Sequence, residues 1–233
     1  MNKNIIFAGA FLLAALQVFV LFEFFQLKTS IKTLSTKQFS VLKDIDKIKN
    51  KVGIENYKKV YNIPIGNSVV IGNKNAKVTI IKWTDFQCPY CQQSVKIVKD
   101  ILRKYPKDVK VVIKNYPLRN HPQALIAAKY ALAAREQGHY ENMYYEIYKR
   151  YRDLKENEYL PLEIAQSLGL DINKLKEDAK SANISNLIKE EMKQLNQSGL
   201  RLAVPRFLIN GKIPEGPRSI ANWSRIIDAE LNQ

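Results

Sequence analysis

Two cysteines separated by two residues are the part of this sequence that could do chemistry. They lie in the run Cys88-Pro89-Tyr90-Cys91, and the 233 residues contain no other cysteine. A thiolate at the start of a helix is stabilised by free backbone N–H groups and by the helix dipole, and its pKa can fall from ~8.5 to ~3.5–7.5. Cys88 is placed for this role. Pro89 suits the first helical position, because it lacks the N–H group that would stay unsatisfied there.

Cys91 follows Cys88 within the first turn of the predicted helix. A second thiol at this distance can attack a mixed disulfide formed at the first and release the bound partner. We therefore predict thiol–disulfide exchange, with Cys88 as the nucleophile and Cys91 as the resolving thiol. The Cys88–Cys91 disulfide is the expected redox group, and no further cofactor is expected.

Two other uses of the cysteines are weighed against exchange. The pair could be half of a zinc site completed by His121 and His139, but 29 residues separate Cys91 from His121 and 17 separate the histidines. These intervals match no zinc-finger spacing. The pair could instead be inert buried thiols, but its position between a strand end and a helix start disfavours this interpretation.

The elements that must position the cysteines follow from the apolar pattern. Short β-branched runs at 69–71 and 78–83 predict two strands, joined by a turn at 72–75. Apolar residues at helical spacing predict a helix from Cys91 to Tyr105, and the segment 109–116 is again typical of a strand. The order strand, helix, strand predicts a right-handed crossover between two parallel strands.

A helical block follows, from His121 to about Gln197. Breaks at Gly138, Pro161 and residues 169–171 divide it into four or five predicted helices. Four tyrosines within it recur at helical spacing and are interpreted as core or interdomain packing: Tyr140, Tyr144, Tyr148 and Tyr151. We expect His121 to cap or pack its helix.

The chain then returns to a strand. Residues 204–209 predict this strand, Asn210-Gly211 a tight turn, and residues 219–231 a last helix. An α/β frame is therefore split by a helical insertion.

These motifs together resemble the DsbA-type thiol:disulfide oxidoreductases. The resemblance rests on Thr84 to Cys91 after an apolar strand, on His121-Pro122 opening the insertion, and on Val204-Pro205 before Phe-Leu-Ile-Asn-Gly211. It covers about Ile63 to Gln233. It implies a thioredoxin fold with an inserted helical domain at about 119–197, in a membrane-anchored bacterial member of the family.

The resemblance also implies roles for residues around the cysteines. Pro205 would be a cis proline lying against the pair, and the backbone of Val204 would pair with an extended substrate chain. Pro89 and Tyr90 are expected to support the active site or bind substrate.

The sequence departs from the family pattern at two places. Many members carry an acidic residue six positions before the first cysteine, where it is thought to assist proton transfer from the resolving thiol, but Lys82 occupies that position here. A buried ammonium near Cys88 would favour its thiolate. Alternatively, the lysine reaches solvent past the strand end and has little effect. Leu202-Ala203 stands where glycine or threonine is common before the proline.

An apolar run precedes the globular part. Residues 5–22 are uncharged, and the run extends to residue 25 past Glu23. Eighteen residues at ~1.5 Å each nearly cross a bilayer of ~30 Å. A cleaved signal peptide is the alternative, but no small residues follow the run to form a cleavage site. We predict a transmembrane signal anchor over residues 1–27, which contacts the lipid bilayer through residues 5–25.

Residues 28–62 are predicted to form a helical stalk or linker, and residues 63–233 the globular domain. Within residues 28–60, apolar residues on alternating three- and four-residue steps, with Gln38 filling the one missing place, form about three heptads: Ile31, Leu34, Val41, Ile45, Ile48 and Val52. Three heptads are the minimum for a coiled coil, and they are marginal in isolation. A plain stalk is therefore favoured over a homo-oligomer formed through it.

The net charge of +15 comes from 37 lysines and arginines against 22 acids. Such a charge makes nucleic acid or an anionic membrane a partner to consider. Nine lysines against three acids place +6 of it in residues 28–60. The other basic residues are spread without a recognised binding motif, so no nucleic-acid partner is expected.

Charge counts around the apolar run favour a cytoplasmic body, because Lys28, Lys32, Lys37 and Lys43 follow it. A dithiol oxidase, however, requires an oxidising compartment. We therefore predict a single-pass protein of the cytoplasmic membrane with its catalytic domain in the periplasm or cell envelope.

The predicted function is the introduction of disulfide bonds into reduced exported proteins. The resemblance implies reoxidation by a quinone-linked membrane oxidase of the DsbB or vitamin K epoxide reductase-like type. A disulfide isomerase or reductase on the same fold is the first alternative. A non-catalytic periplasmic chaperone, in which the cysteines would be dispensable, is the second.

Overall fold

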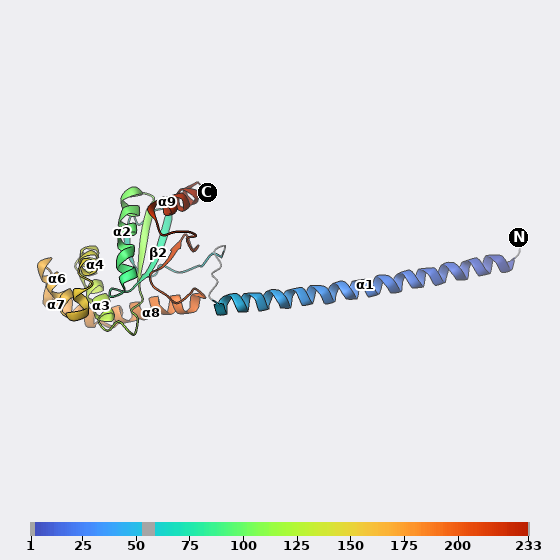
Figure 1. The fold of residues 1–233 in the computed structure, drawn as a ribbon, viewed down its shortest axis with the longest axis horizontal. Helices are drawn as coiled ribbons and strands as arrows, with labels where there is room; N and C mark the ends of the chain where they lie inside the picture. The colour runs from blue at the N-terminus through green and yellow to red at the C-terminus, as the bar shows by residue number, and fades with distance from the viewer. Residues whose placement is uncertain (1–2, 53–58, 233) are drawn as a thin grey trace. The chain divides into compact units, whose positions relative to one another are not determined.

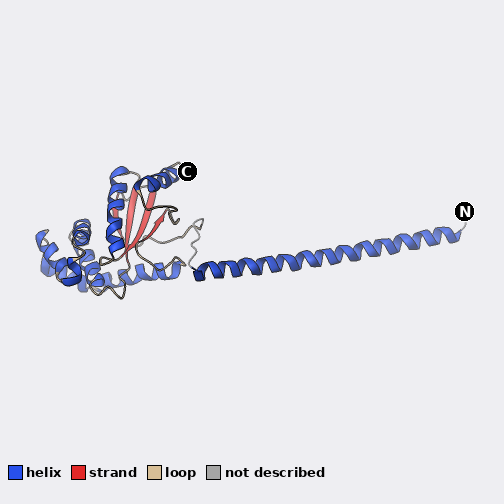
Figure 2. Cartoon of the chain, in the orientation of Figure 1, coloured by secondary structure: helices blue, strands red, loops and turns tan. Residues whose placement is uncertain are grey.

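A computed structural model describes residues 3–52 and 59–232. The chain divides into two compact units, Met1–Glu55 and Asn56–Gln233. Figure 1 shows the fold coloured along the chain, and Figure 2 shows it by secondary structure.

The first unit contains one long helix, α1 (Lys3–Val52), of 50 residues. This helix runs without a break through the predicted border between anchor and stalk at residue 27. Its described side chains, which lie between residues 16 and 44, are all exposed. Those of residues 5–15 and of Ile45, Ile48 and Val52, and all of stalk residues 53–58, lie outside the described part.

No helix among the described residues combines the length and apolar content needed to cross a bilayer. The transmembrane helix therefore stays a prediction that the structure does not support.

The second unit is built on a four-stranded mixed sheet. Its strands are β1 (Val69–Gly72), β2 (Val78–Thr84), β3 (Val109–Asn115) and β4 (Arg206–Ile209), in the spatial order β1-β3-β2-β4. β2 and β3 are parallel, as predicted for a crossover through α2 (Pro89–Lys104). β1 is antiparallel to β3, and β4 is antiparallel to β2.

The turn after β1 is present, but it does not join neighbouring strands. β3 lies between β1 and β2, because the parallel crossover places β3 directly beside β2. A turn pattern records how two strands are linked and carries no information about a later segment that pairs between them.

Alternating residues of β2 face two different cores. Val78 and Ile80 pack with α2 and with α9 (Ile220–Leu231), whereas Ile81 and Trp83 pack with the C-terminal part of α8 (Ala182–Ser198). This follows from the two-residue period of a strand. Because both faces are covered, almost all of β2 is buried, and Lys82 is its only charged residue. Figure 1 shows α2 and α9 beside the sheet, with α8 below it.

The insertion between β3 and β4 forms the predicted helical block (Figure 2). The structure describes all of residues 121–197, and within them six helices form: α3 (Ala124–Arg135), α4 (Tyr140–Lys149), α5 (Asp153–Glu156), α6 (Leu160–Ser167), α7 (Ile172–Lys180) and α8. The prediction of four or five missed the single turn α5 and the break at Ser181. Ser181 ends α7 and caps α8, since its side chain accepts a hydrogen bond from the backbone N–H of Ile184.

The turn after β4 has the predicted form. Asn210 and Gly211 both adopt positive φ, at 45° and 79°, as a tight hairpin turn requires. The Asn210 side chain also accepts a hydrogen bond from the backbone N–H of Thr79, at 2.8 Å. α9 then begins beside Ser219, whose hydroxyl caps it.

Candidate active site

Cys88 is the capping residue at the N-terminus of α2, at the end of the short loop that follows β2. Its backbone is extended (φ −76°, ψ 121°), and Pro89 occupies the first helical position. The backbone N–H groups of Cys91 and Gln92 donate to the Cys88 carbonyl at 3.0 and 3.1 Å. The predicted placement of both cysteines on the first turn is therefore confirmed, although the helix begins two residues before Cys91.

The two thiols have opposite acidities. Cys88 exposes 4% of its surface, whereas Cys91 exposes none. A hydrogen bond from the Cys91 thiol, helped by the backbone N–H groups of Cys91 and Tyr90, lowers the pKa of Cys88 to about 6. Burial raises the pKa of Cys91 well above its usual range, and the adjacent Cys88 adds to this effect. Near neutral pH the pair therefore carries its negative charge on Cys88.

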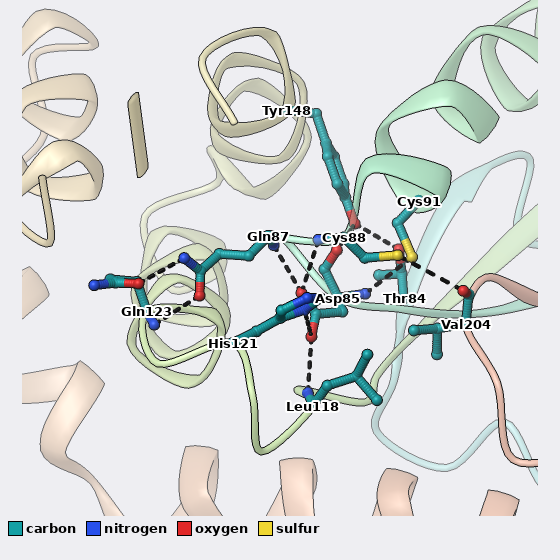
Figure 3. A network of polar contacts seen from close by, with 10 residues as sticks. All are labelled: Thr84, Asp85, Gln87, Cys88, Cys91, Leu118, His121, Gln123, Tyr148 and Val204. Atoms are coloured by element: carbon teal, nitrogen blue, oxygen red, sulfur yellow. Dashed lines mark hydrogen bonds and ion pairs between the residues drawn. The ribbon is translucent and has the colours of Figure 1, made fainter. Parts of the chain in front are cut away.

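The segment before β4 lies against this thiol, as the resemblance implies. The Val204–Pro205 peptide bond is cis. The Cys88 Sγ atom lies 3.7 Å from the Val204 carbonyl oxygen, across 116 residues of sequence. Figure 3 shows the two sulfur atoms close together and directed toward this carbonyl. Tyr90, between the cysteines, is 64% exposed beside them.

Lys82 is fully buried on β2, so the alternative in which its side chain reaches solvent is wrong. Its Nζ atom donates to the Tyr144 hydroxyl at 2.7 Å and to the Cys91 carbonyl at 3.4 Å. The rings of Tyr144, Tyr148 and Phe207 surround it at 5.3–5.8 Å. Burial lowers the pKa of Lys82 to about 7, although the nearby Cys91 opposes this effect. The amine lies beside the resolving cysteine, whereas the sequence-based hypothesis concerned Cys88.

Tyr140, Tyr144 and Tyr148 of α4 are buried in the core, as predicted, whereas Tyr151 follows the helix and is only partly buried. Two of the buried tyrosines also contribute polar groups. Tyr144 and Tyr148 are completely or almost completely buried, and both contact the ring of Phe86. Tyr144 accepts the hydrogen bond of Lys82, and the Tyr148 hydroxyl bonds the Thr84 hydroxyl and donates to the Asp85 carbonyl. The helical insertion therefore contacts the end of β2 and the start of the loop, residues 85–88, that leads to α2.

Asp85 and His121 are site residues that the sequence analysis missed. The Asp85 carboxylate accepts hydrogen bonds from the backbone of Cys88 at 3.0 Å, and its other oxygen lies 2.9 Å from His121 Nδ1 (Figure 3). His121 precedes α3, so the expectation that it caps or packs its helix is replaced by this contact. An aspartate three residues before a helix-capping position is a known turn signal and could have pointed to this role.

The two histidines of the zinc alternative do not gather around the cysteines. In the part of the chain that the structure describes, no group of three histidine, cysteine or acidic side chains is arranged to hold a metal ion.

Comparisons with known proteins assign the chain to a family. A protein-family model described as Thioredoxin matches residues 65–229. Among solved structures, BdbD from Bacillus subtilis superimposes with a TM-score of 0.66 at 18% identity, covering 76% of this chain and 100% of that one. The DsbA1 structure from Wolbachia pipientis gives 0.62 at 18%, covering 73% and 94%. A periplasmic thioredoxin-like protein from Salmonella enterica serovar Typhimurium gives 0.60 at 21%, covering 75% and 94%. The predicted thioredoxin fold with a helical insertion is thus confirmed.

The curated relatives that match this chain are named as Na(+)/H(+) antiporters and not as thioredoxin-like proteins. The Na(+)/H(+) antiporter NhaA 3 of Salinispora tropica is 31% identical over 159 residues, which are 68% of this chain and 24% of the antiporter. The NhaA 1 protein of Mycolicibacterium gilvum is 27% identical over 163 residues, or 26% of its length. This chain therefore spans about a quarter of these relatives.

Proposed function

Because the chain belongs to the thioredoxin family, we propose that it is a DsbA-like dithiol oxidase, which introduces disulfide bonds into exported proteins. The observation that carries this proposal is the difference in acidity between Cys88 and Cys91. A thiol of low pKa is a good leaving group, and a disulfide whose reduced form is stabilised in this way is a strong oxidant.

The proposed cycle begins with the Cys88–Cys91 disulfide. A client thiolate attacks Cys88 Sγ, so that the Cys88–Cys91 bond breaks, a client–Cys88 disulfide forms and Cys91 leaves as a thiolate. A second client thiolate then attacks the client sulfur and releases Cys88 as its stable thiolate. The client loses two electrons and gains one disulfide, while the cysteine pair gains the two electrons. Cys91 retains a proton near neutral pH, because burial raises its pKa.

Four residues around the pair support these steps. Lys82 lies beside Cys91, so an ammonium there would stabilise the transient Cys91 thiolate and supply its proton. The Val204 backbone lies beside Cys88, where it would pair with an extended client segment. Pro89 fits the helix start, and the exposed Tyr90 ring offers the client an aromatic contact.

The proposed partners are reduced exported proteins as clients and a quinone-linked membrane oxidase, of the DsbB or vitamin K epoxide reductase-like type, which reoxidises the pair. We place the catalytic domain in the periplasm or cell envelope. The similar thioredoxin-like protein from Salmonella enterica serovar Typhimurium is periplasmic, which supports this placement. No cofactor beyond the cysteines and no nucleic-acid partner is proposed.

The N-terminal part is proposed to be a membrane anchor over residues 1–27, followed by a stalk. The exposed apolar side chains of α1, including Phe22 and Phe25, are compatible with lipid contact. A stalk that associates through Ile31, Leu34 and Val41, which are also exposed, would give a homo-oligomer. Sedimentation of residues 28–233 separates the two forms, since a monomer indicates a plain stalk.

The reduction potential tests the proposed direction of electron flow. Equilibration with glutathione is expected to give a value near ~−120 mV, as for an oxidase, whereas ~−270 mV would indicate a reductase. Oxidative refolding of a reduced client is the second measurement. We expect the Cys88→Ser variant to be inactive in it, and a variant that kept full activity toward clients would support the non-catalytic chaperone instead.

A further inference from the structure

Asp85 carries a buried carboxylate and is the first residue of the loop that joins β2 to α2, residues 85–88. Its side chain exposes none of its surface. One oxygen accepts the backbone N–H groups of Gln87 at 2.7 Å and of Cys88 at 3.0 Å. The other accepts the backbone N–H of Leu118 at 2.7 Å and lies 2.9 Å from His121 Nδ1. Four donors therefore fix the orientation of one carboxylate (Figure 3).

The same residue contacts both members of the pair. Its carboxylate holds the Cys88 backbone, and its own backbone N–H donates to the Cys91 sulfur at 3.4 Å. A carboxylate this close to Cys88 opposes a second negative charge there, because like charges disfavour each other's ionised forms. Asp85 therefore fixes the geometry of the loop and also limits how strongly the Cys88 thiolate is stabilised.

His121 reaches Asp85 from the insertion, 36 residues away in sequence. A second contact joins the same two segments, because Gln87 and Gln123 exchange hydrogen bonds in both directions. An N–H group directed at a carboxylate offsets part of its negative field. The start of the insertion is thus placed to modulate the charge that Asp85 presents to Cys88.

We propose that Asp85 and His121 are a pair of positioning residues that sets the reactivity of Cys88, with Asp85 opposing the thiolate and His121 offsetting Asp85. The proposal deepens the proposed function, on which it rests. It predicts opposite effects at the two positions. If the two residues only held the loop in place, substitutions at Asp85 and at His121 would change the reactivity of Cys88 in the same direction.

The test measures alkylation of the reduced, full-length protein by iodoacetamide at pH 5, together with the absorbance of the thiolate at 240 nm. Asp85→Asn keeps an oxygen for the Gln87 and Cys88 backbone and removes the charge. A fall of about 0.5 in the Cys88 pKa would raise the alkylation rate at pH 5 about threefold. His121→Ala removes a donor to Asp85 and is expected to lower the rate. His121→Asn, whose amide nitrogen can replace Nδ1, is expected to restore it.

Asp100→Asn is the matched control, since Asp100 lies on α2, the helix that Cys88 caps, and pairs with Lys96 and Arg103. It removes the same charge and should leave the Cys88 titration unchanged. The proposal is overturned if Asp85→Asn leaves the alkylation rate unchanged or lowers it, or if Asp85→Asn and His121→Ala change the rate in the same direction. It is also overturned if Asp100→Asn changes the rate as much as Asp85→Asn does.

If Asp85→Asn fails to fold, the alkylation rates of His121→Ala and His121→Asn test the proposal. A slower alanine variant supports the proposal, and equal rates overturn it. Alkylation involves neither client nor oxidant. A reduction potential that contradicts the proposed oxidase therefore leaves this result interpretable.

Discussion

The two cysteines share one helical turn and yet differ in acidity, because their surroundings differ. Cys88 receives hydrogen bonds from the Cys91 thiol and from the first backbone N–H groups of α2, whereas Cys91 is sealed from water. Hydrogen bonds to the charged form lower a thiol pKa, and burial raises it. The assignment of nucleophile and resolving thiol therefore has a local physical cause.

Replacing the resolving thiol should raise the pKa of the nucleophile. In Cys91→Ala the strongest donor to the Cys88 sulfur is lost, so its pKa is expected to rise from about 6 toward the ordinary value. The pH dependence of iodoacetamide alkylation measures this shift. Cys91→Ser keeps a hydroxyl donor and serves as the control, with a smaller rise. A pKa that stayed near 6 in the alanine variant would show that the helix N-terminus alone sets it.

The burial of Lys82 should lower the free energy of unfolding, because burial disfavours the charged form of its amine. The lowering of its pKa from 10.5 to about 7 corresponds to about 5 kcal/mol. Lys82→Met removes this cost and leaves the Tyr144 hydroxyl without its donor, which costs about 1–3 kcal/mol. The free energy of unfolding at pH 7 is therefore expected to rise by about 2–4 kcal/mol, as measured by urea unfolding.

The sign of the pH dependence gives a second check on Lys82. Between pH 7 and 10.5 the unfolded chain binds a proton at this residue that the native protein has released, so this residue makes the stability of the native protein increase with pH. Lys82→Met should lose this increase. Lys110→Met, at a partly exposed lysine of β3, should change stability by no more than about 0.5 kcal/mol and retain it.

At the level of elements, a buried polar cluster fastens the insertion to the sheet. Glu191 on α8 accepts hydrogen bonds from the Ser68 hydroxyl at 2.7 Å and from the backbone and side chain of Asn115 at 2.6 and 2.8 Å. Lys114 donates to Ser68 and to the backbone carbonyls of Pro64 and Ile65. α8, the end of β3 and the segment before β1 therefore meet in one network.

Removing Glu191 should destabilise the second unit. Glu191→Ala leaves Ser68 and Asn115 with unpaired polar groups next to the Lys114 amine, which is expected to cost about 3 kcal/mol. Chemical unfolding measures the loss. The adjacent Glu190→Ala, at an exposed position of the same helix, should stay within about 0.5 kcal/mol. Equal losses in the two variants would contradict a role for the network.

At the scale of the whole molecule, the chemistry is confined to the second unit. Every contact described for the cysteines, Lys82 and Asp85 comes from residues within Asn56–Gln233. Among the described residues, the first unit carries most of the exposed large apolar side chains, and it holds part of the excess positive charge. Redox chemistry and membrane attachment should therefore be separable by truncation.

Residues 56–233 alone are expected to unfold cooperatively and to keep the Cys88 pKa of about 6. The full chain should sediment with vesicles of anionic phospholipid, because residues 5–25 are apolar and lysines follow them. The truncated protein should remain in the supernatant. Sedimentation of both proteins would place the membrane contact in the second unit, and sedimentation of neither would argue against the anchor.

Local patterns in the sequence predicted Cys88 as the nucleophile and Cys91 as the resolving thiol. They also determined the paired parallel strands, the helical insertion and the turn at Asn210 and Gly211. Each of these depends on neighbours within a few residues, through strand and helix periodicity, proline at a helix start or a turn that requires positive φ. The cis proline and its place beside Cys88 came from the family resemblance, since no local pattern specifies them.

Only the tertiary structure decided the position of β3 between β1 and β2, the burial of Lys82, and the contacts of Asp85 with His121. These features join segments separated by tens of residues. Their geometry depends on how whole elements pack, and packing is determined by side-chain volume and by the need to pair every buried polar group. A lysine in an apolar strand can reach solvent or stay inside. Here the rings of the insertion enclose it, and that enclosure places a weakly held proton beside the resolving thiol.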